Sequence, residues 1–351
     1  MKNRILILVP PLNRLGGVAL HYKGLANFWN EDVSYFETFK TSNKRKWHIF
    51  PALYNYLVFI ITLLIKCPHI VVVNISLKQG FFSKNLYMTI GRIFKKEIIV
   101  FIHGWDIEKE YLLSKSEAKS IFKCNGFIVL SKLFKEHLSK YISPSKIYLT
   151  TTKVDDNLIG DYDNSLRTGY IKNILFLSRI EKEKGIFITI DTYKQLLIKH
   201  PHLKLSIVGD GTAMNEVRQL IENSSLKNVT IYGRLSGDEL INSFLNADIF
   251  VFPTTHGEGM PGALLEAMSF GLPIITRPVG GIPDFFVNGE MGLLTDSLNA
   301  ADYSRYIEYL IDNPQLVLKI SHNNYNYAKK HFMASIVAKN MEEIFNQIAN
   351  K

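Results

Sequence analysis

The chain has 351 residues, of which 47% are hydrophobic and 21% charged, a composition that supports a folded core and excludes disordered and collagen-like proteins. Its length suits about two domains of ~150 residues each. The two cysteines, Cys67 and Cys124, provide neither a disulfide framework nor a cysteine-based zinc site. A reducing compartment fits this cysteine usage, and we expect a cytoplasmic protein.

The net charge of +9 is concentrated in the first half of the chain. Residues 1–165 carry 23 Lys and Arg against 13 Asp and Glu, whereas residues 166–351 carry 18 against 19. This asymmetry favours an anionic partner for the first half, although solubility alone could also explain it. We expect no nucleic-acid partner, because no element interleaves basic and aromatic residues as such a recognition element requires.

One apolar run stands out, the 17 uncharged residues Ile49–Ile65, with basic Lys44–Lys46 before it and Lys66 after it. A membrane span needs ~20 apolar residues, and a proline and an asparagine interrupt this run. We therefore expect a helix buried in the first domain. A helix lying on a membrane surface is the main alternative, and a true span is the least favoured. A signal peptide is not expected, because Ile5–Val9 is too short for its apolar core.

Short apolar runs alternate with longer amphipathic ones along the first half of the chain. The predicted strands are Arg4–Val9, Ser34–Phe39, His69–Asn74, Glu97–His103, Gly126–Leu130 and Lys146–Leu149. Helices predicted between them include Val18–Trp29, Phe81–Phe94 and Lys132–Tyr141. Nearly continuous apolar strands separated by helices predict a parallel sheet covered on both faces.

The alternation breaks at Thr150–Tyr170, which we interpret as a linker, and then resumes. The second set of predicted strands is Ile174–Leu177, Leu203–Val208, Val229–Tyr232, Ile249–Phe252, Pro273–Thr276 and Gly292–Leu294. The helices predicted among them are Gly185–Lys199, Thr212–Ser224, Gly237–Asn246, Gly262–Phe270 and Ala300–Asp312. The sequence thus predicts an α/β protein with two tandem Rossmann-like, doubly wound domains, 1–165 and 166–332. Because ligands bind beyond the carboxyl ends of parallel strands, we expect the site in the cleft between them.

The densest motif is Phe252–Ile275, which follows a predicted strand and opens a helix. Glu258 and Glu266 lie eight residues apart, and Gly259 and Gly262 lie at the turn into the helix. A helix N-terminus exposes unpaired N–H groups and a partial positive charge, and glycines let a ligand approach the backbone. The pattern favours binding of a polar, hydroxylated or anionic ligand over two surface glutamates on a capped helix.

Two cations mark a second candidate site in Leu175–Ile186. Arg179 and Lys184 follow the end of a predicted strand and flank the start of a helix, a placement that suits a diphosphate. Weaker signals are Gly16-Gly17 after the first strand and Gly209-Asp210-Gly211 after a later one, either of which could be an ordinary turn. Neither completes the glycine pattern of a nicotinamide site.

His103 ends an apolar strand, where catalytic groups collect, although a lone histidine is more often structural. An α/β-hydrolase would also need a G-x-S-x-G elbow, which is absent from the sequence. Asp161-Tyr162-Asp163 reads D-x-D, a metal–diphosphate signature in other sugar transferases. Within the predicted linker it is better interpreted as an exposed acidic turn.

The run EGMPGALLEAMSFGLPII, followed by PVGGIPD, resembles the retaining glycosyltransferases of family 4, which have the GT-B fold. The basic pair, the Gly209-Asp-Gly turn, the YGRLS stretch and Gly16-Gly17 all fall in the family's order. The resemblance covers essentially the whole chain. It is strong in residues 174–295 and weak in residues 40–100, where the acceptor usually binds.

The resemblance implies a role for each matching residue. Arg179 and Lys184 match the basic pair that grips the donor diphosphate. Glu266 matches the second glutamate of the E-x7-E motif, which contacts ribose hydroxyls, and Glu258 matches the first, beside the transferred sugar. His103 matches the first-domain histidine that faces the reacting sugar. Further substrate contacts are implied at Gly16, Gly17, Gly209, Gly233, Arg234, Gly259, Met260, Pro261 and Gly262.

The implied reaction transfers a sugar from a UDP- or GDP-linked donor with retention of configuration, without metal or other cofactor. Cations and helix N–H groups then stabilise the leaving diphosphate, which takes the acceptor's proton. We expect a saccharide acceptor, lipid-linked and used in bacterial surface-polysaccharide assembly, with residues 40–96 docking on an anionic cytoplasmic membrane surface. The last helix, within residues 333–351, is expected to cross back onto the first domain.

One departure concerns the usual Asn-Gly-Val-Asp, which reads Thr152-Lys153-Val154-Asp155 here and puts any role of Asp155 in doubt. Two alternatives stay open. An epimerase acting on a nucleotide sugar would share the architecture, and a non-catalytic protein could bind the same ligand. A nicotinamide oxidoreductase is disfavoured, because both the glycine pattern and an acidic ribose partner are missing.

Overall fold

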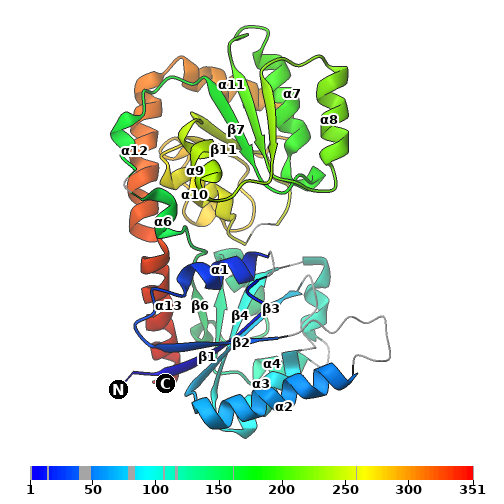
Figure 1. The fold of residues 1–351 in the computed structure, drawn as a ribbon, viewed down its shortest axis with the longest axis vertical. Coiled ribbons are helices and arrows are strands. Elements are labelled where there is room, and N and C mark those ends of the chain that lie inside the picture. Colours follow the sequence, from blue (N-terminus) through cyan, green and yellow to red (C-terminus); the bar gives the residue numbers. More distant parts are fainter. Residues whose placement is uncertain are drawn as a thin grey trace. The chain divides into compact units, whose positions relative to one another are not determined.

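The computed structural model describes residues 2–13, 16–38, 49–77, 84–105, 107–114, 118–160, 162–257 and 259–350. Contacts divide the chain into two compact units, each described here by itself (Figure 1). The first unit comprises Met1–Lys153 and Ala334–Lys351, and the second comprises Val154–Met333.

A six-stranded parallel sheet forms the centre of the first unit. Its strands are β1 (Arg4–Val9), β2 (Asp32–Glu37), β3 (Ile70–Ser76), β4 (Glu97–Gly104), β5 (Gly126–Val129) and β6 (Ile147–Leu149). They lie in the order β2-β1-β3-β4-β5-β6, and every neighbouring pair is parallel. β3 is buried along almost its whole length, as expected of a strand covered on both faces.

Helices cover both faces of this sheet. They are α1 (Gly17–Leu25), α2 (Ile49–Lys66), α3 (Asn85–Ile93), α4 (Lys119–Phe122), α5 (Lys132–Ser139) and α13 (Ala334–Ala349), with the 3₁₀ helices η4 (Ile107–Ser114) and η6 (Pro144–Lys146). Alternate strand residues such as Val71 and Val100 pack with Phe59 of α2 and Met88 of α3 in one hydrophobic cluster. On the other face α13 packs against α1 and β4. Figure 1 shows α1 and α2 on opposite sides of the sheet.

The second unit repeats the architecture with a second parallel sheet. Its strands are β7 (Asn173–Leu177), β8 (Lys204–Val208), β9 (Val229–Gly233), β10 (Ile249–Phe252), β11 (Ile274–Thr276) and β12 (Gly292–Leu294), in the order β12-β11-β10-β7-β8-β9. The α-helices are α6 (Asp156–Ile159), α7 (Ile186–Leu196), α8 (Met214–Asn223), α9 (Gly237–Leu245), α10 (Gly262–Ser269), α11 (Ala300–Ile311) and α12 (Pro314–His331). The 3₁₀ helices are η7 (Asn164–Leu166), η8 (Lys182–Lys184) and η9 (Ile282–Asp284). The predicted α/β class with two parallel sheets is confirmed.

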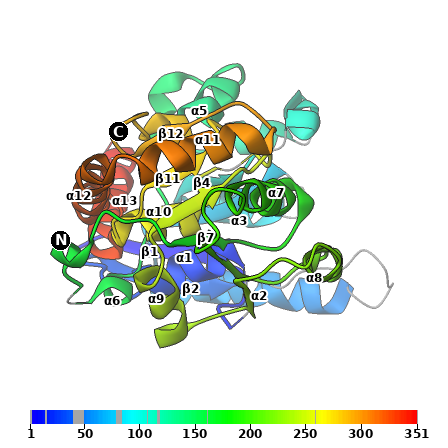
Figure 2. The same ribbon diagram turned by 90° about the horizontal axis from the view of Figure 1, so that it is seen from above.

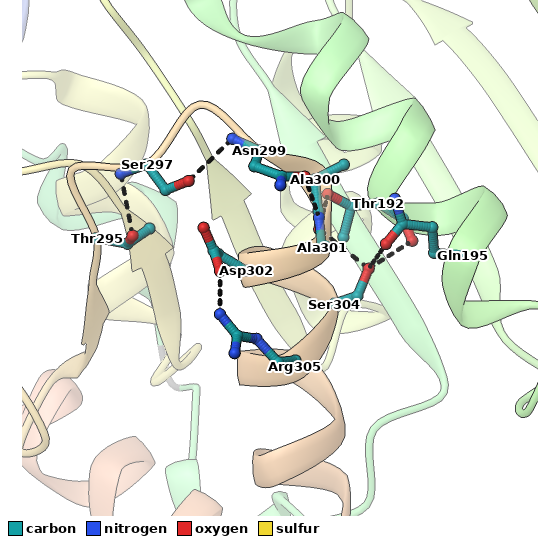
Figure 3. Close-up of polar contacts among 10 residues, drawn as sticks. All are labelled: Thr192, Gln195, Thr295, Ser297, Asn299, Ala300, Ala301, Asp302, Ser304 and Arg305. Atoms are coloured by element: carbon teal, nitrogen blue, oxygen red, sulfur yellow. Dashed lines mark hydrogen bonds and ion pairs between the residues drawn. The ribbon is translucent and has the colours of Figure 1, made fainter.

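Helices α7 and α11 pack side by side in the second unit (Figure 2). Asn299 caps α11, because its side-chain oxygen accepts a hydrogen bond from the Ala301 N–H at 3.0 Å. One turn later, the buried Ser304 hydroxyl lies 3.3 Å from the Thr192 carbonyl of α7 and 3.2 Å from Gln195 Oε1 (Figure 3). The Asn299 cap thus begins α11, and the Ser304 contacts join α11 to α7.

The segment interpreted as a linker is in large part a packed element of the second unit, and residues 154–165 therefore group with the second unit and not the first. Arg167 explains this difference. Its guanidinium donates to the carbonyls of Phe244 at 3.1 Å and Phe270 at 2.9 Å, which lie at the ends of α9 and α10. Tyr162 also donates to the Phe270 carbonyl, at 3.0 Å. Asp163 caps η7, and the first aspartate of the D-x-D lies outside the described residues.

Helix α12 was not predicted, although Asn313-Pro314 is a helix-start signal and Pro314 occupies the first turn of this helix. Its buried face contains the polar Ser321 and Asn324, which weakens the apolar periodicity. Asn324 donates to the carbonyls of Leu272 and Met291, both at 2.8 Å, so the polar residue serves as a tie to the sheet edge.

The apolar run of the first unit forms α2 and is buried on one face alone. Phe59 and Leu63 are buried, whereas Leu57 and Ile61 are exposed. In the described part of the chain, no helix combines the length and the apolarity that crossing a membrane requires.

Candidate active site

Parallel sheets bind ligands where the order of strands reverses, at their carboxyl ends. In the second unit the chain runs outward from β7 to β8 and β9, and then returns to place β10 on the other side of β7. The reversal therefore lies between β7 and β10. The loop after β7 carries Arg179 and Lys184, and the loop after β10 leads through Gly259 to α10. The two strongest sequence motifs thus follow the two strands that flank this position.

Backbone hydrogen bonds join these loops to one another. Ile180 N donates to the Asp210 carbonyl at 3.0 Å, which ties the loop after β7 to the turn after β8. Thr255 N donates to the Glu183 carbonyl at 2.8 Å, and this bond joins the loop after β10 to the loop after β7. Gly209 N in turn donates to Gly233 O at 2.7 Å, at the end of β9. Four of the predicted binding segments therefore form one continuous cluster.

Two glycines of this cluster are required by close backbone packing. At Gly209 the backbone has φ of +131°, and a Cβ would lie 1.8 Å from the Ser178 carbonyl oxygen. At Gly185 φ is +83°, and a Cβ would lie 2.3 Å from the Pro253 carbonyl oxygen. Gly262 differs, because a Cβ there would meet none of the described atoms within 4 Å. Because Gly262 has no side chain, open space remains at the N-terminus of α10.

The charged residues of the cluster differ in their exposure. Lys184 is 5% exposed in spite of its charge, at the end of η8. The Arg179 side chain is 61% exposed, and its guanidinium lies 2.8 Å from Glu181 Oε1. Glu266 is half-buried on α10, one turn after Gly262, and Arg234 is exposed after β9. The structure brings the segments of these residues together.

The N-terminus of α10 carries the remaining predicted contacts. Pro261 is buried in the position preceding the first helical residue, whereas Gly259 and Met260 are half-buried before it. Glu258, the first glutamate of the E-x7-E motif, lies outside the described residues. Its role beside the transferred sugar stays a prediction, as do the other assigned roles.

Arg277 is a residue of this edge that the sequence analysis missed. It follows β11 directly, and its guanidinium donates to the Thr254 carbonyl at 3.4 Å and to the Asp296 carbonyl at 3.0 Å. It thereby braces the loop that leads to α10. A basic residue immediately after a predicted strand is the signal that could have identified it.

The first unit has its own reversal of strand order, between β1 and β3. Gly16 and Gly17 lie at the start of α1, after β1, and a Cβ on either would meet none of the described atoms within 4 Å. His103 lies next to the last residue of β4. The predicted residues of the first unit therefore lie after β1 and at the end of β4, the two strands on either side of β3.

A buried side-chain network joins these strand ends. His103 Nε2 lies 2.7 Å from Asn74 Oδ1 on β3, and the Tyr22 hydroxyl of α1 lies 2.9 Å from the same oxygen. Asn74 Nδ2 donates to the Leu8 carbonyl of β1 at 2.7 Å. Asn74 and Tyr22 were not predicted; an asparagine within the apolar run IVVVNIS was the available signal.

A second histidine, His21 of α1, packs beside His103 with ring centroids 5.7 Å apart. His21 is 3% exposed, and neither of its ring nitrogens has a hydrogen-bond partner among the described residues. Burial, with a contribution from the charge of Lys153, lowers the pKa of His21 to about 3. Burial and the adjacent His21 also lower the pKa of His103 well below its ordinary value. Both imidazoles are therefore neutral at pH 7.

Comparisons with known proteins agree with this architecture. Residues 168–331 match the family described as "Glycosyl transferases group 1". The capsular polysaccharide biosynthesis glycosyltransferase CapM of Staphylococcus aureus is 28% identical over 228 residues, which cover 62% of this chain and 58% of CapM. The chain thus spans less than two thirds of that relative's length.

Two solved structures show the same fold over nearly the whole chain. Anabaena HepE, crystallised with UDP and glucose, has a TM-score of 0.75 at 16% identity and matches 98% of this chain and 99% of its own. A glycosyltransferase from Rickettsia africae has a TM-score of 0.77 at 19% identity and matches 99% and 98%. Residues 168–331 are therefore similar to the group 1 glycosyl transferases, and the two six-stranded parallel α/β sheets of the chain are those of the GT-B fold.

Proposed function

We propose that this chain transfers a sugar from a nucleotide-sugar donor to a saccharide acceptor, and that the second unit binds the donor's diphosphate. The observation that carries the proposal is the joining of the Arg179–Gly185 loop to the loop that leads into α10, at the reversal of strand order. This places a buried lysine and an exposed arginine in the same loop cluster as a glycine-rich helix N-terminus.

The chemistry of glycosyl transfer requires such groups. Departure of the diphosphate leaves negative charge on the leaving group and positive character on the sugar. Lys184, Arg179 and the N–H groups at the start of α10 would stabilise that charge without a divalent ion. Following the family resemblance, the leaving phosphate takes the acceptor proton and the anomeric configuration is retained. Glu266 would hold the ribose hydroxyls, and His103 would face the transferred sugar.

The donor is proposed to be UDP-linked, with GDP as the alternative. The HepE structure contains UDP and glucose, which supports a uridine nucleotide. The test is a screen of UDP- and GDP-sugars for stabilisation against thermal unfolding. A ligand at 100 times its Kd should add about 2.7 kcal/mol to the free energy of unfolding.

The matched pair of variants is Arg179→Ala and Lys182→Ala. Lys182 lies in the same loop but pairs with Glu216 in solvent, 2.9 Å away, so its loss should leave donor binding unchanged. The proposal requires that Arg179→Ala weaken the stabilisation and Lys182→Ala preserve it. Equal responses would remove the diphosphate assignment. Conversion of the donor into a second nucleotide sugar without any acceptor would indicate an epimerase instead.

For the acceptor we propose a lipid-linked saccharide of a surface polysaccharide, reached at an anionic membrane surface. The similarity to CapM, a glycosyltransferase of capsular polysaccharide biosynthesis, supports this class of product. The exposed apolar residues of α2 form one stripe, since at 100° per residue they fall within about 120° of the helix circumference. They are Leu53, Tyr54, Leu57, Ile61, Leu64 and Ile65.

The charge of the first half complements an anionic surface, where each Lys or Arg contributes about 1 kcal/mol. Within the 40–96 segment, Lys66 and Lys95 are exposed in the structure, whereas Lys44–Lys46 lie outside the described residues. The location proposed is therefore the cytoplasmic side, peripheral to the plasma membrane.

Liposome co-sedimentation tests this docking surface. Vesicles with an anionic lipid should bind the protein at low salt, and neutral vesicles should bind it weakly. Leu57→Glu with Ile61→Glu should abolish binding. Ile198→Glu, at an even more exposed apolar position of the second unit, should not. Failure to bind anionic vesicles at low salt, or binding that survives the α2 substitutions, would remove the membrane proposal.

A further inference from the structure

We propose that Asn74 is a positioning residue that holds His103 in its Nε2-protonated tautomer, so that Nδ1 presents a lone pair to a hydroxyl of the transferred sugar. The part that concerns the sugar rests on the proposed function. The tautomer itself follows from the hydrogen bonds of the first unit.

A backbone carbonyl determines the orientation of the Asn74 amide. The atom 2.7 Å from the Leu8 carbonyl oxygen must be a donor, because a carbonyl oxygen can only accept. That atom is therefore the nitrogen Nδ2. The opposite atom of the amide, which faces Tyr22 and His103, is the oxygen Oδ1.

An amide oxygen has two lone pairs and no proton, so both groups that approach it must donate. The Tyr22 hydroxyl donates at 2.9 Å. Burial raises the pKa of Tyr22 above its ordinary value, so this hydroxyl keeps its proton. His103 Nε2 lies 2.7 Å from the same oxygen and must carry a proton as well. Because the imidazole is neutral, Nδ1 is unprotonated and can accept a hydrogen bond.

Aromatic neighbours restrain the His103 ring in the orientation that this hydrogen bond requires. Phe101 lies two residues earlier on β4, and its ring centroid is 3.9 Å from that of His103. The rings of His21 and Tyr22 pack against His103 with their planes at 70° and 73° to it. A ring flip that exchanged the two nitrogens would have to displace this packing and break the bond to Asn74.

The restrained tautomer has a chemical consequence at a sugar site. An Nδ1 lone pair accepts a hydrogen bond from a sugar hydroxyl, whereas an Nδ1–H group would donate to the hydroxyl oxygen, so the tautomer determines the direction of that hydrogen bond. A tautomer fixed before the substrate binds also avoids reorganisation during the reaction. Asn74 thus acts through His103, and Tyr22 acts by occupying the second lone pair of the Asn74 oxygen.

The first measurement is the ¹⁵N spectrum of the histidine side chains in the free protein at pH 7.5, since the two ring nitrogens give separate signals when one is protonated and the other is not. The His103 signals are assigned by their loss in His103→Gln. We expect a protonated Nε2 and an unprotonated Nδ1. A protonated Nδ1 in the parent protein would overturn the inference, whatever the variants do.

The second measurement compares two substitutions that remove the same kind of contact. Asn74→Leu deletes the acceptor of His103, and its spectrum should show a mixture of tautomers. Asn55→Leu is the matched control, because Asn55 is also buried, accepts from Tyr87 and donates to a backbone carbonyl at 3.4 Å. It should destabilise the first unit while leaving the His103 signals unchanged. An unchanged tautomer in Asn74→Leu would contradict the assignment to Asn74.

Kinetics with the donor found by the screen tests the sugar contact. Asn74→Leu should lower kcat about 10- to 100-fold, as loss of an outer partner of a functional histidine does in metal sites, with KM for the donor changed less than about 3-fold. Tyr22→Phe, which keeps the amide, should have a smaller effect on kcat. A kcat unaffected by Asn74→Leu would refute the sugar contact. If no nucleotide sugar binds, the proposed function fails while the tautomer measurement still decides the role of Asn74.

Discussion

Backbone hydrogen bonds join the loops after β7, β8 and β10 in the second unit, whereas side chains join the corresponding strand ends in the first. The backbone arrangement of the second unit depends on glycines that no other residue can replace without displacing a carbonyl. The side-chain arrangement of the first unit depends on an asparagine, a tyrosine and two neutral histidines. The two sheets share the same α/β architecture, but the carboxyl ends of their strands are held differently. Backbone packing holds them in the second unit, and buried polar side chains hold them in the first. The predictions below test this contrast, beginning with the largest expected effect.

The largest effect is expected at Lys184 of the second unit. Lys184→Met should lower turnover of the donor about 10²- to 10³-fold, because it removes a preorganised cation from the leaving diphosphate. Lys182→Met, on the same 3₁₀ helix but ion-paired with Glu216, should retain parental turnover. A coupled assay of released nucleotide measures both. Similar turnover in the two variants would show that the buried cation does not serve the leaving group.

Backbone packing among the loops of the second unit is tested by Gly209→Ala. A Cβ 1.8 Å from the Ser178 carbonyl, at φ of +131°, should cost about 2–3 kcal/mol of the free energy of unfolding. Gly16→Ala in the first unit, with open space around it, should change that free energy by less than about 0.5 kcal/mol. Urea unfolding followed by circular dichroism measures both. Equal costs would mean that glycine is not needed for packing at Gly209.

The buried histidines of the first unit are tested by the dependence of stability on pH. Because the pKa of His21 falls from 6.5 to about 3 on folding, the unfolded chain binds more protons between these two pH values. Stability is therefore lost as the pH falls below 6.5, and His21 alone accounts for about 2 kcal/mol by pH 5. His21→Phe should remove that part of the pH dependence.

Tryptophan fluorescence reports this transition selectively, because Trp29 and Trp105 belong to the first unit and the sequence of the second unit, Val154–Met333, contains no tryptophan. Their fluorescence should show the loss of stability between pH 7 and pH 5, and its reduction in His21→Phe. The same slope of the free energy of unfolding against pH in the parent and in His21→Phe would show that burial does not hold His21 neutral.

The smallest effect is expected away from both edges, at the cap of α11. Asn299→Ala removes the acceptor of the Ala301 N–H and should lower the free energy of unfolding by about 1 kcal/mol. Turnover should be unchanged, since in the described part of the chain the N–H and the side chain of the cap residue Asn299 hydrogen-bond to Ser297 and Ala301, which are not proposed site residues. A loss of turnover as large as that of Lys184→Met would show that activity responds to general destabilisation of the second unit.

The sequence was most informative where a single strand or turn determines the structure. The apolar runs predicted β1, β10 and β12 with their observed bounds, and a parallel order of strands followed from the helices between them. The motif around Gly262 also predicted the strand-to-helix turn that begins α10. These features depend on neighbouring residues, which a sequence displays directly.

Contacts between distant residues could not be predicted in the same way. Asn74, Tyr22 and His103 lie far apart in the chain and meet because β1, β3 and β4 are adjacent in the sheet. The packing of residues 154–167 depends on Arg167, whose guanidinium donates to carbonyls that lie 77 to 103 residues away in the sequence. The polar stretch looked like a linker because its partners are backbone oxygens, which leave no pattern in the sequence.

The central claim is that the joined loops after β7 and β10 bind the nucleotide diphosphate. Hydrogen exchange of the parent protein, with and without saturating UDP or GDP, tests it most directly. The account predicts slower exchange of the amides in residues 178–185 and 254–262, and unchanged exchange in α2. Nucleotide binding that protects other segments and leaves both of these loops unchanged would contradict it.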